Sequence, residues 1–393
     1  MRATDREITA SSIGAMSHVC VIVYTENTPQ PRVRQRGQRA GRAGRVGILL
    51  FPAEGVGMSA EIRLQDVADA AGVSIATASR ALAGKDRVSR KTQALVKRTA
   101  ERLGYQVNAA ARALREGSNR TIGMIIPVVG NPYYAQVVHA VEAELQEQDL
   151  ELIIADSHGE IEREARRIDL LLGGRVEGLI VVPSDAQGSS EALAKAAARI
   201  PLVQLDRRVE GLATDFIGVD NDRGIDLVIA HLREQGARSI VYIGANDNTS
   251  VGRERRLAFA RSAEGLEIHE PIFGNFSREY GLEAGAALVA RGALPDAIVC
   301  GDDLIAVGVL GALRAAGKRV PRDTLLTGFD DTLLAEITDP PLTSVVQPIA
   351  ALAREAIRAL LMRTEDRHSP TVYSRIAPQL VVRESTQYTE PGL

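Results

Sequence analysis

One stretch constrains this chain more than any other: residues 62–82 have the pattern of two short helices joined by a tight turn. The first helix has apolar residues at the i, i+3, i+4, i+7 spacing of one face, namely Leu64, Val67, Ala68 and Ala71. Gly72 supplies the backbone freedom that a sharp turn needs, and Ser74 is suited to cap the next helix. That second helix, 75–82, is expected to bury Ala78 and Leu82.

Two helices that meet across such a turn form a helix-turn-helix, whose second helix is narrow enough to enter the major groove of DNA. The alternative is an ordinary helical hairpin inside a larger core. A third helix is predicted next, capped by Ser89, running to Leu103 and ended by Gly104. Three helices in this order favour the DNA-binding interpretation.

The residues around these helices resemble the DNA-binding domain and hinge of the LacI-type (LacI/GalR) family of bacterial transcription regulators. The matching residues fall in register: Asp66-Val-Ala, Ala71-Gly-Val-Ser, Thr77, Ser79-Arg, Val88-Ser, Gly104-Tyr, Asn108, Ala111-Arg and Leu114. The resemblance covers the chain beyond residue 60. It implies that the DNA contacts of this domain come from Leu64, Ser74, Ile75, Ala76, Thr77, Ser79, Arg80, Arg87 and Ser89.

The chemistry of these side chains divides their expected roles. Ile75 and Ala76, which stand at the family's operator-choosing positions, can offer only apolar contact, for example to a thymine methyl group. Arg80 can bind the two acceptors on the edge of a guanine. The hydroxyl groups and Arg87 suit phosphates, which fix the register of the protein without reading sequence.

The segment from Asn108 to Leu114 resembles the family's hinge helix. Such a short segment is not stable alone in water, so it is expected to fold on DNA, in pairs, within the minor groove. The functional residues implied are Asn108, Ala111 and Leu114, with Leu114 wedged between base pairs. A plain linker helix is the alternative. A paired wedge requires a homodimer on a near-palindromic operator.

Charge and cysteine usage agree with this interpretation. The net charge is −3, but residues 61–118 carry +5, residues 1–60 carry +4 and the remainder carries −12. A basic module on an acidic body is typical of nucleic-acid binders. Two cysteines, Cys20 and Cys300, make no disulfide framework, and no apolar run is long enough to span a membrane. We therefore expect a cytoplasmic protein.

Residues 1–59 fit no folded pattern, since the Pro-, Gly- and Arg-rich run 30–45 has neither a helix nor a strand period. They are interpreted as a disordered tail or as the result of a start codon placed too early. The second interpretation arises because the sequence from Met58 onward resembles the usual N-terminus of the family. A basic arm that binds phosphates is the alternative. The predicted domains are then 60–107 for DNA binding, 108–118 for the hinge and 119–393 for the effector-binding and dimerisation domain.

From residue 121 onward, short apolar strands alternate with helices, which predicts parallel sheets covered on both faces. Two successive runs suggest two doubly wound lobes whose strand ends face each other across a cleft. The expected fold is thus an all-α helix-turn-helix domain plus an α/β effector domain that resembles periplasmic sugar-binding proteins. The apolar stripe on the last helix, 349–362, is expected to lie in the core rather than at a dimer contact.

The resemblance places the ligand site of this domain at Tyr133, Tyr134, Asp206, Arg255, Phe276, Asp302 and Asp330. Carboxylates, a guanidinium and aromatic rings suit a polyol, whose hydroxyls and apolar face they can bind. For each acid alone, a helix N-cap is the simpler alternative. Asp302 stands where many relatives have an amide. This extra carboxylate favours a neutral ligand over an anionic one, although Arg255 leaves an anionic ligand open.

No catalytic motif, phosphate-binding loop or metal-ligand spacing was found, so no enzyme, metal or cofactor is expected. The sequence predicts a DNA-binding transcription regulator, most simply a repressor, whose operator affinity changes when a sugar or related metabolite binds. A transport-type sugar-binding protein would share the lobes but not the helix-turn-helix.

Overall fold

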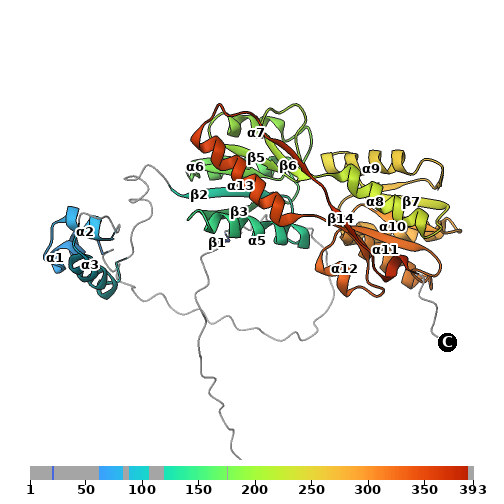
Figure 1. Cartoon of the computed structure of the whole chain (residues 1–393), viewed down its shortest axis with the longest axis horizontal. Coiled ribbons are helices and arrows are strands. Elements are labelled where there is room, and N and C mark those ends of the chain that lie inside the picture. Colours follow the sequence, from blue (N-terminus) through green and yellow to red (C-terminus); the bar gives the residue numbers. More distant parts are fainter. Residues whose placement is uncertain (1–19, 22–61, 83–87, 106–118, 175, 388–393) are drawn as a thin grey trace, which may run out of the picture. The chain divides into compact units, whose positions relative to one another are not determined.

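The structure is a computed structural model that describes residues 20–21, 62–82, 88–105, 119–174 and 176–387 of the 393-residue chain. The chain forms two compact units, one holding the three helices before residue 106 and the other holding both sheets (Figure 1). The predicted hinge residues Asn108, Ala111 and Leu114, together with Arg87, lie outside the described residues.

The first unit consists of α1 (Leu64–Ala70), α2 (Ile75–Leu82) and α3 (Arg90–Leu103). Their core is built from the buried residues Val67, Ala68, Ala78, Ala81, Val96 and Ala100. The predicted turn and caps are confirmed: Gly72 has a positive φ of 64°, and the amide of Thr77 donates to the Ser74 hydroxyl over 3.2 Å. Ser89 accepts likewise from Thr92, and Gly104 ends α3 with a φ of 70°.

One expected core position is wrong. Leu82 is only partly buried, and Ala81 is the fully buried residue beside Ala78. Residues 78 and 81 are three apart and therefore lie on one helix face, where small side chains let α2 pack closely against α3. The predicted helices and their order are otherwise as expected.

The first lobe of the second unit is a parallel sheet with helices on both faces. Its strands are β2 (Thr121–Ile126), β3 (Glu151–Asp156), β4 (Gly178–Val181), β5 (Leu202–Leu205), β6 (Asp215–Val219) and β13 (Tyr373–Ile376). Its helices are α5 (Pro132–Gln146), α6 (Ile161–Gly173), α7 (Ser190–Ala197) and α13 (Ile349–Glu365). The sheet order is β1-β3-β2-β4-β5-β6-β13, where β1 is the two-residue strand Cys20–Val21, parallel to β3.

That short strand departs from the expectation of a wholly disordered tail; the other residues before 62 lie outside the described part of the chain. The apolar stripe of α13 lies in the core, as expected: Leu352, Ala353, Ala356, Ile357 and Leu360 are buried against α5 and the sheet.

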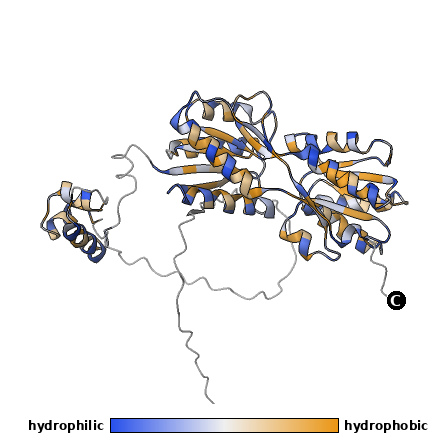
Figure 2. Cartoon of the chain, in the orientation of Figure 1, coloured by the Kyte–Doolittle hydropathy of each residue, from blue (hydrophilic) through white to orange (hydrophobic). Residues whose placement is uncertain are grey.

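The second lobe has a similar arrangement with the sheet order β14-β12-β11-β10-β7-β8, except that β14 is antiparallel to β12. Its strands are β7 (Ser239–Ala245), β8 (Glu267–Ile268), β9 (Ile272–Gly274), β10 (Ala297–Cys300), β11 (Leu325–Asp330), β12 (Thr343–Val346) and β14 (Gln379–Val381). Its helices are α8 (Asn221–Glu234), α9 (Ser250–Ser262), α10 (Arg278–Ala290), α11 (Asp303–Ala315) and α12 (Leu333–Ile337), followed by the 3-10 turn η1 (Glu384–Thr386). The strands of both lobes are predominantly hydrophobic, as Figure 2 shows.

The chain passes between the lobes three times: from β6 to α8, from β12 to α13 and from β13 to β14. At the first and third crossings the strands are joined, because the amide of Asp220 donates to the carbonyl of Ile376 over 2.9 Å. In the described parts of the chain, no helix is both long and apolar enough to cross a membrane.

Candidate functional site

The exposed face of α2 is the candidate DNA-reading surface. Ile75, Ala76 and Arg80 are exposed, and Ile75 keeps 46 % of its surface accessible although it is a large apolar residue. Thr77 and Ser79 are partly buried beside them, Leu64 is partly buried at the start of α1, and Ser74 and Ser89 are exposed at the helix starts. An apolar and a cationic side chain thus share one open helix face, which suits base edges in a groove.

Arg80 is held along its own helix, because its Nε donates to the carbonyl of Ala76 over 3.0 Å. The Ser74 hydroxyl lies 2.8 Å from the hydroxyl of Thr77. These local bonds set the direction of the Ser74, Thr77 and Arg80 side chains.

The seven residues expected to bind the ligand line one cavity in the second unit: Tyr133, Tyr134, Asp206, Arg255, Phe276, Asp302 and Asp330. They come from both lobes and stand at the carboxyl ends of the strands or at the starts of the following helices. The cavity therefore lies where open parallel sheets place their ligand sites. The roles of the seven residues remain predictions.

On the side of the first lobe, Asp206 follows β5 and accepts from two tyrosines. The hydroxyls of Tyr133 and Tyr134 lie 3.2 Å from its Oδ1 and Oδ2 atoms, respectively. The Tyr133 hydroxyl also lies 3.0 Å from Oε1 of Gln347, which stands at the second crossing between the lobes. A single hydroxyl proton can serve only one of these acceptors at a time.

On the side of the second lobe, Gln347 Nε2 donates to Asp330 Oδ1 over 2.7 Å. Arg255 lies beside that carboxylate, with 3.7 Å between Nη2 and Oδ1, and stacks over the ring of Phe329 at 3.5 Å. Asp206 and Asp330 are thereby connected through Tyr133 and Gln347. One polar network spans both lobes.

Asp302 and Asp303 begin α11. Asp302 Oδ1 accepts from the amide of Ile305 over 2.7 Å, so the N-cap alternative holds for one of its oxygens. Asp303 is engaged elsewhere, accepting from Ser344 Oγ and from the amide and hydroxyl of Thr332. Asp302 lines the cavity, whereas Asp303 holds β12 and the segment before α12 in place.

The cavity carboxyls are perturbed by their surroundings. Burial raises the pKa of Asp302 to about 7, with a further contribution from the neighbouring charge of Asp303. Burial also raises the pKa of Asp330 and of Asp206, against the opposing effect of Arg255 and Arg207. Asp206 and Asp330 have positive φ angles of 65° and 107°, a backbone conformation uncommon for residues other than glycine. Strained, buried carboxyls in one cavity are typical of functional sites.

Four further residues line this cavity that the sequence did not single out: Asn131, Arg207, Val251 and Gln347. Arg207 follows Asp206 directly, so its position at the end of β5 was a signal that could have identified it as a lining residue. Asn131 caps α5, accepting from the amide of Tyr133 over 2.9 Å, and Asn-Pro is itself a cap signal. Val251 and Gln347 reach the site through the fold, and no local pattern marks them.

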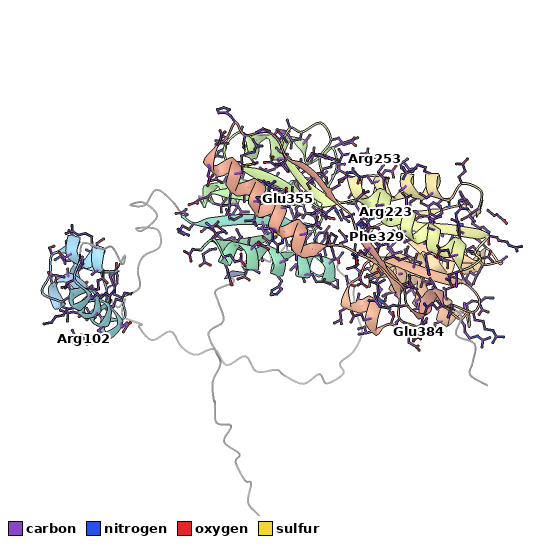
Figure 3. All side chains as sticks on the ribbon, viewed as in Figure 1. Arg102, Arg223, Arg253, Phe329, Glu355 and Glu384 are labelled. Carbon is purple, nitrogen blue, oxygen red and sulfur yellow. The ribbon has the colours of Figure 1, made fainter. Side chains whose placement is uncertain are left out.

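A set of contacts joins the two lobes beside the cavity. The amide of Ala186 donates to the carbonyl of Asn248 over 2.7 Å, and the amide of Arg208 donates to Ser250 Oγ over 3.0 Å. Arg253, labelled in Figure 3 at the start of α9, forms an ion pair with Glu210 of the first lobe. Glu254 accepts from Arg208 and from Arg375. We refer to these five contacts as the interlobe clasp.

The described residues contain no group of three or more His, Cys, Asp or Glu side chains arranged to hold a metal ion. The cavity instead offers carboxylate acceptors, guanidinium and phenol donors, and the rings of Tyr133, Tyr134 and Phe276. This arrangement can orient a small polar molecule that also has an apolar face.

Two family models match the chain. Residues 63–108 match the description "Bacterial regulatory proteins, lacI family", and residues 229–386 match "Periplasmic binding protein-like domain". The first match covers the three helices of the first unit and extends into the residues after α3. The second covers most of the second lobe and the return through α13.

The matches to curated and solved relatives cover nearly the whole length of each relative. The HTH-type transcriptional repressor PurR of Photobacterium profundum is 30 % identical over 328 residues, covering 82 % of this chain and 98 % of the relative. The lac repressor dimer bound to operator and an anti-inducer shares the fold with a TM-score of 0.76 at 24 % identity, covering 83 % and 99 % of the two chains. The CelR–cellobiose complex has a TM-score of 0.63 at 30 % identity, covering 82 % and 99 %.

Proposed function

Because the chain belongs to the LacI family of bacterial regulatory proteins, we propose that it represses transcription by binding a near-palindromic operator as a homodimer. In this proposal α2 reads the major groove through Ile75, Ala76 and Arg80, and the hydroxyls near the helix starts bind phosphates. The hinge residues Asn108, Ala111 and Leu114 bind the minor groove. The protein is a regulator rather than an enzyme and acts on DNA in the cytoplasm.

The effector is a small polyhydroxylated molecule, a sugar or a related metabolite. The single observation that carries this proposal is the convergence of three carboxylates, two guanidinium groups and three aromatic rings from both lobes on one cavity. A relative of 30 % identity was solved as a complex with cellobiose, which supports a sugar. Acceptors pair with hydroxyls, and rings cover the apolar face of a sugar.

Ligand binding alters operator affinity by changing how the lobes close. A molecule in the cavity contacts Asp206 on one side and Asp330 on the other, so it changes the relative stability of open and closed lobes. The movement changes the spacing of the two hinge segments in a dimer. An inducer favours the spacing in which the hinges cannot fold on DNA, and a corepressor favours the other.

The experiment is to titrate purified full-length protein onto DNA from upstream of its own gene, at a stated salt concentration, with and without a panel of sugars. Loss of binding with one compound identifies an inducer, and gain identifies a corepressor. DNA binding that no compound alters would contradict the proposed switch.

A further inference from the structure

The charges of the cavity do not balance. Three carboxylates line it, Asp206, Asp302 and Asp330, against the two guanidinium groups of Arg207 and Arg255. All five side chains are at least nine-tenths buried, so water screens their charges poorly. If every group is ionised, the lining has one negative charge in excess. Asp303, the residue after Asp302 in the chain, adds a second negative charge.

Arg255 has little capacity left for a ligand. Its Nε donates to Asn221 Oδ1 over 2.8 Å and its Nη1 donates to the carbonyl of Gly301 over 2.6 Å. Its Nη2 faces Asp330, and only 2 % of the residue is exposed. Arg255 therefore positions Asp330 and neutralises it, which leaves few donors for a bound molecule.

Arg207 is directed toward the other side of the cavity. Its guanidinium carbon lies 5.3 Å from the ring centre of Phe276 and 5.9 Å from that of Tyr134, and its Nε is 3.9 Å from Asp206 Oδ2. That buried Nε has no hydrogen-bond partner among the described residues. Arg207 thus belongs with Asp206 and the aromatic rings, where a hydroxyl oxygen can accept from it.

Asp302 is the cavity carboxylate that forms no ion pair with either guanidinium among the described residues. One of its oxygens caps α11, the residue is 1 % exposed, and no ion pair among the described residues joins it to a cation. A buried carboxylate without a counter-ion is costly, and a ligand that supplies the missing positive charge removes that cost.

We propose that the effector of this cavity is a polyol that carries a protonated amine, and that its ammonium group pairs with Asp302. The hydroxyls of the ligand bind Asp206, Arg207 and Asp330, and the rings of Tyr134 and Phe276 cover its apolar face. An ammonium has three donors and one positive charge, which the cavity lacks. This inference rests on the proposed function and narrows its ligand from any sugar to an amine-bearing one.

The test uses sugars matched in pairs that differ only in the group of interest. Glucosamine, galactosamine and mannosamine are titrated into the full-length protein by calorimetry at pH 7, each beside the parent hexose and the N-acetyl derivative. We expect at least one amino sugar to bind ten times more tightly than both of its neutral partners. Equal affinity within every pair, or a panel in which no amino sugar binds, overturns the proposal.

Asp302→Asn is the decisive variant, because asparagine is an equally good N-cap and α11 keeps its first turn. We expect it to abolish the preference for the amino sugar over the parent hexose. The control is Asp149→Asn in the first lobe, whose side chain is 93 % exposed and whose positive φ asparagine tolerates. A preference for the amine that persists in Asp302→Asn contradicts the assignment.

Proton linkage gives a second readout. Asp302 is partly protonated near pH 7, so an ammonium that pairs with it displaces part of a proton, measurable as a binding heat that differs between phosphate and Tris buffers. The titratable groups that face Asp302 are Asp303, Asp330, Arg255, Arg207, Tyr242 and Cys300. The Asp302→Asn variant therefore has to lose this buffer dependence.

The failures of the two proposals are distinguishable, because calorimetry measures the ligand without DNA. If a neutral sugar binds and releases the operator, the proposed function stands and this inference fails. If an amino sugar binds with the predicted preference but leaves operator affinity unchanged, this inference stands and the switch fails.

Discussion

Arg208 of the first lobe reaches Glu254 of the second, with 3.4 Å between Nε and Oε1. Glu254 also accepts from Arg375 of β13 over 2.7 Å and from the side-chain amide of Asn221 over 2.9 Å. The Glu254 carboxylate on α9 thus contacts two arginines of the first lobe. It also accepts from Asn221, whose side chain in turn accepts from Arg255 of the cavity. The interlobe clasp and the cavity share this connection.

Glu254→Gln should weaken closure of the lobes. The amide keeps an acceptor for Asn221 but loses the charge that attracts Arg208 and Arg375, at a cost of about 1.5 kcal/mol. If the closed form binds the effector, ligand affinity falls roughly tenfold. Calorimetry measures the affinity, and small-angle scattering measures the opening. Glu279→Gln, an acid 76 % exposed on α10, is the matched control and should change neither.

Arg80→Ala should lower operator affinity by about 1–3 kcal/mol and relax the base preference at one position of each half-site. Arg80 is exposed and, among the described residues, its side chain donates within its own helix, so the free energy of unfolding should change little. Binding to a set of operators with single base changes checks this. Arg98 is exposed on α3, and Arg98→Ala should lower the affinity for DNA by a smaller amount that is the same for all operator sequences. The same uniform loss for Arg80→Ala would refute a base-reading role.

Leu114→Ala should reduce operator affinity by about 2 kcal/mol, roughly thirtyfold, because it removes the wedge that we propose for the operator centre. Leu114→Met keeps an apolar side chain of similar volume and should bind almost as the wild type does. Fluorescence anisotropy with labelled operator measures both. Unchanged affinity in Leu114→Ala would remove the hinge from the account.

Stability should depend on pH through Asp302. Its ordinary pKa is 3.8 and the folded value is about 7, so the folded state holds this proton more tightly. The contribution to the free energy of unfolding is present below pH 3.8 and is lost as the pH rises toward 7. Asp302→Asn should therefore raise the melting temperature at pH 8, by about 3 °C or more, and have a smaller effect at pH 5. An equal shift at both pH values would show that the carboxyl titrates normally in the fold.

The sequence was most informative where structure is set by neighbouring residues. Ser74, Ser89 and Gly104 were predicted as helix boundaries because a cap depends on residues three or four positions away. The strands before Asp206, Asp302 and Asp330 were predicted because buried parallel strands are short apolar runs.

Features that depend on distant parts of the chain were not predictable in this way. The segments β8, β9 and α12 are too short to carry a period, so they were missed. Gln347 reaches Asp330 and Tyr133 only because the chain returns between the lobes beside them. Arg255 was expected to bind the ligand through its forked donors, but the fold commits most of those donors to Asn221 and Gly301.

The most direct test of the account is to measure the affinity of the effector for the free protein and for the protein saturated with operator. If the cavity is coupled to the DNA, the two affinities must differ by the same factor by which the effector changes operator affinity. We predict a ratio of about 10 or more, which is roughly 1.4 kcal/mol of coupling. Equal affinities in the presence and absence of operator would contradict the claim that this cavity controls DNA binding.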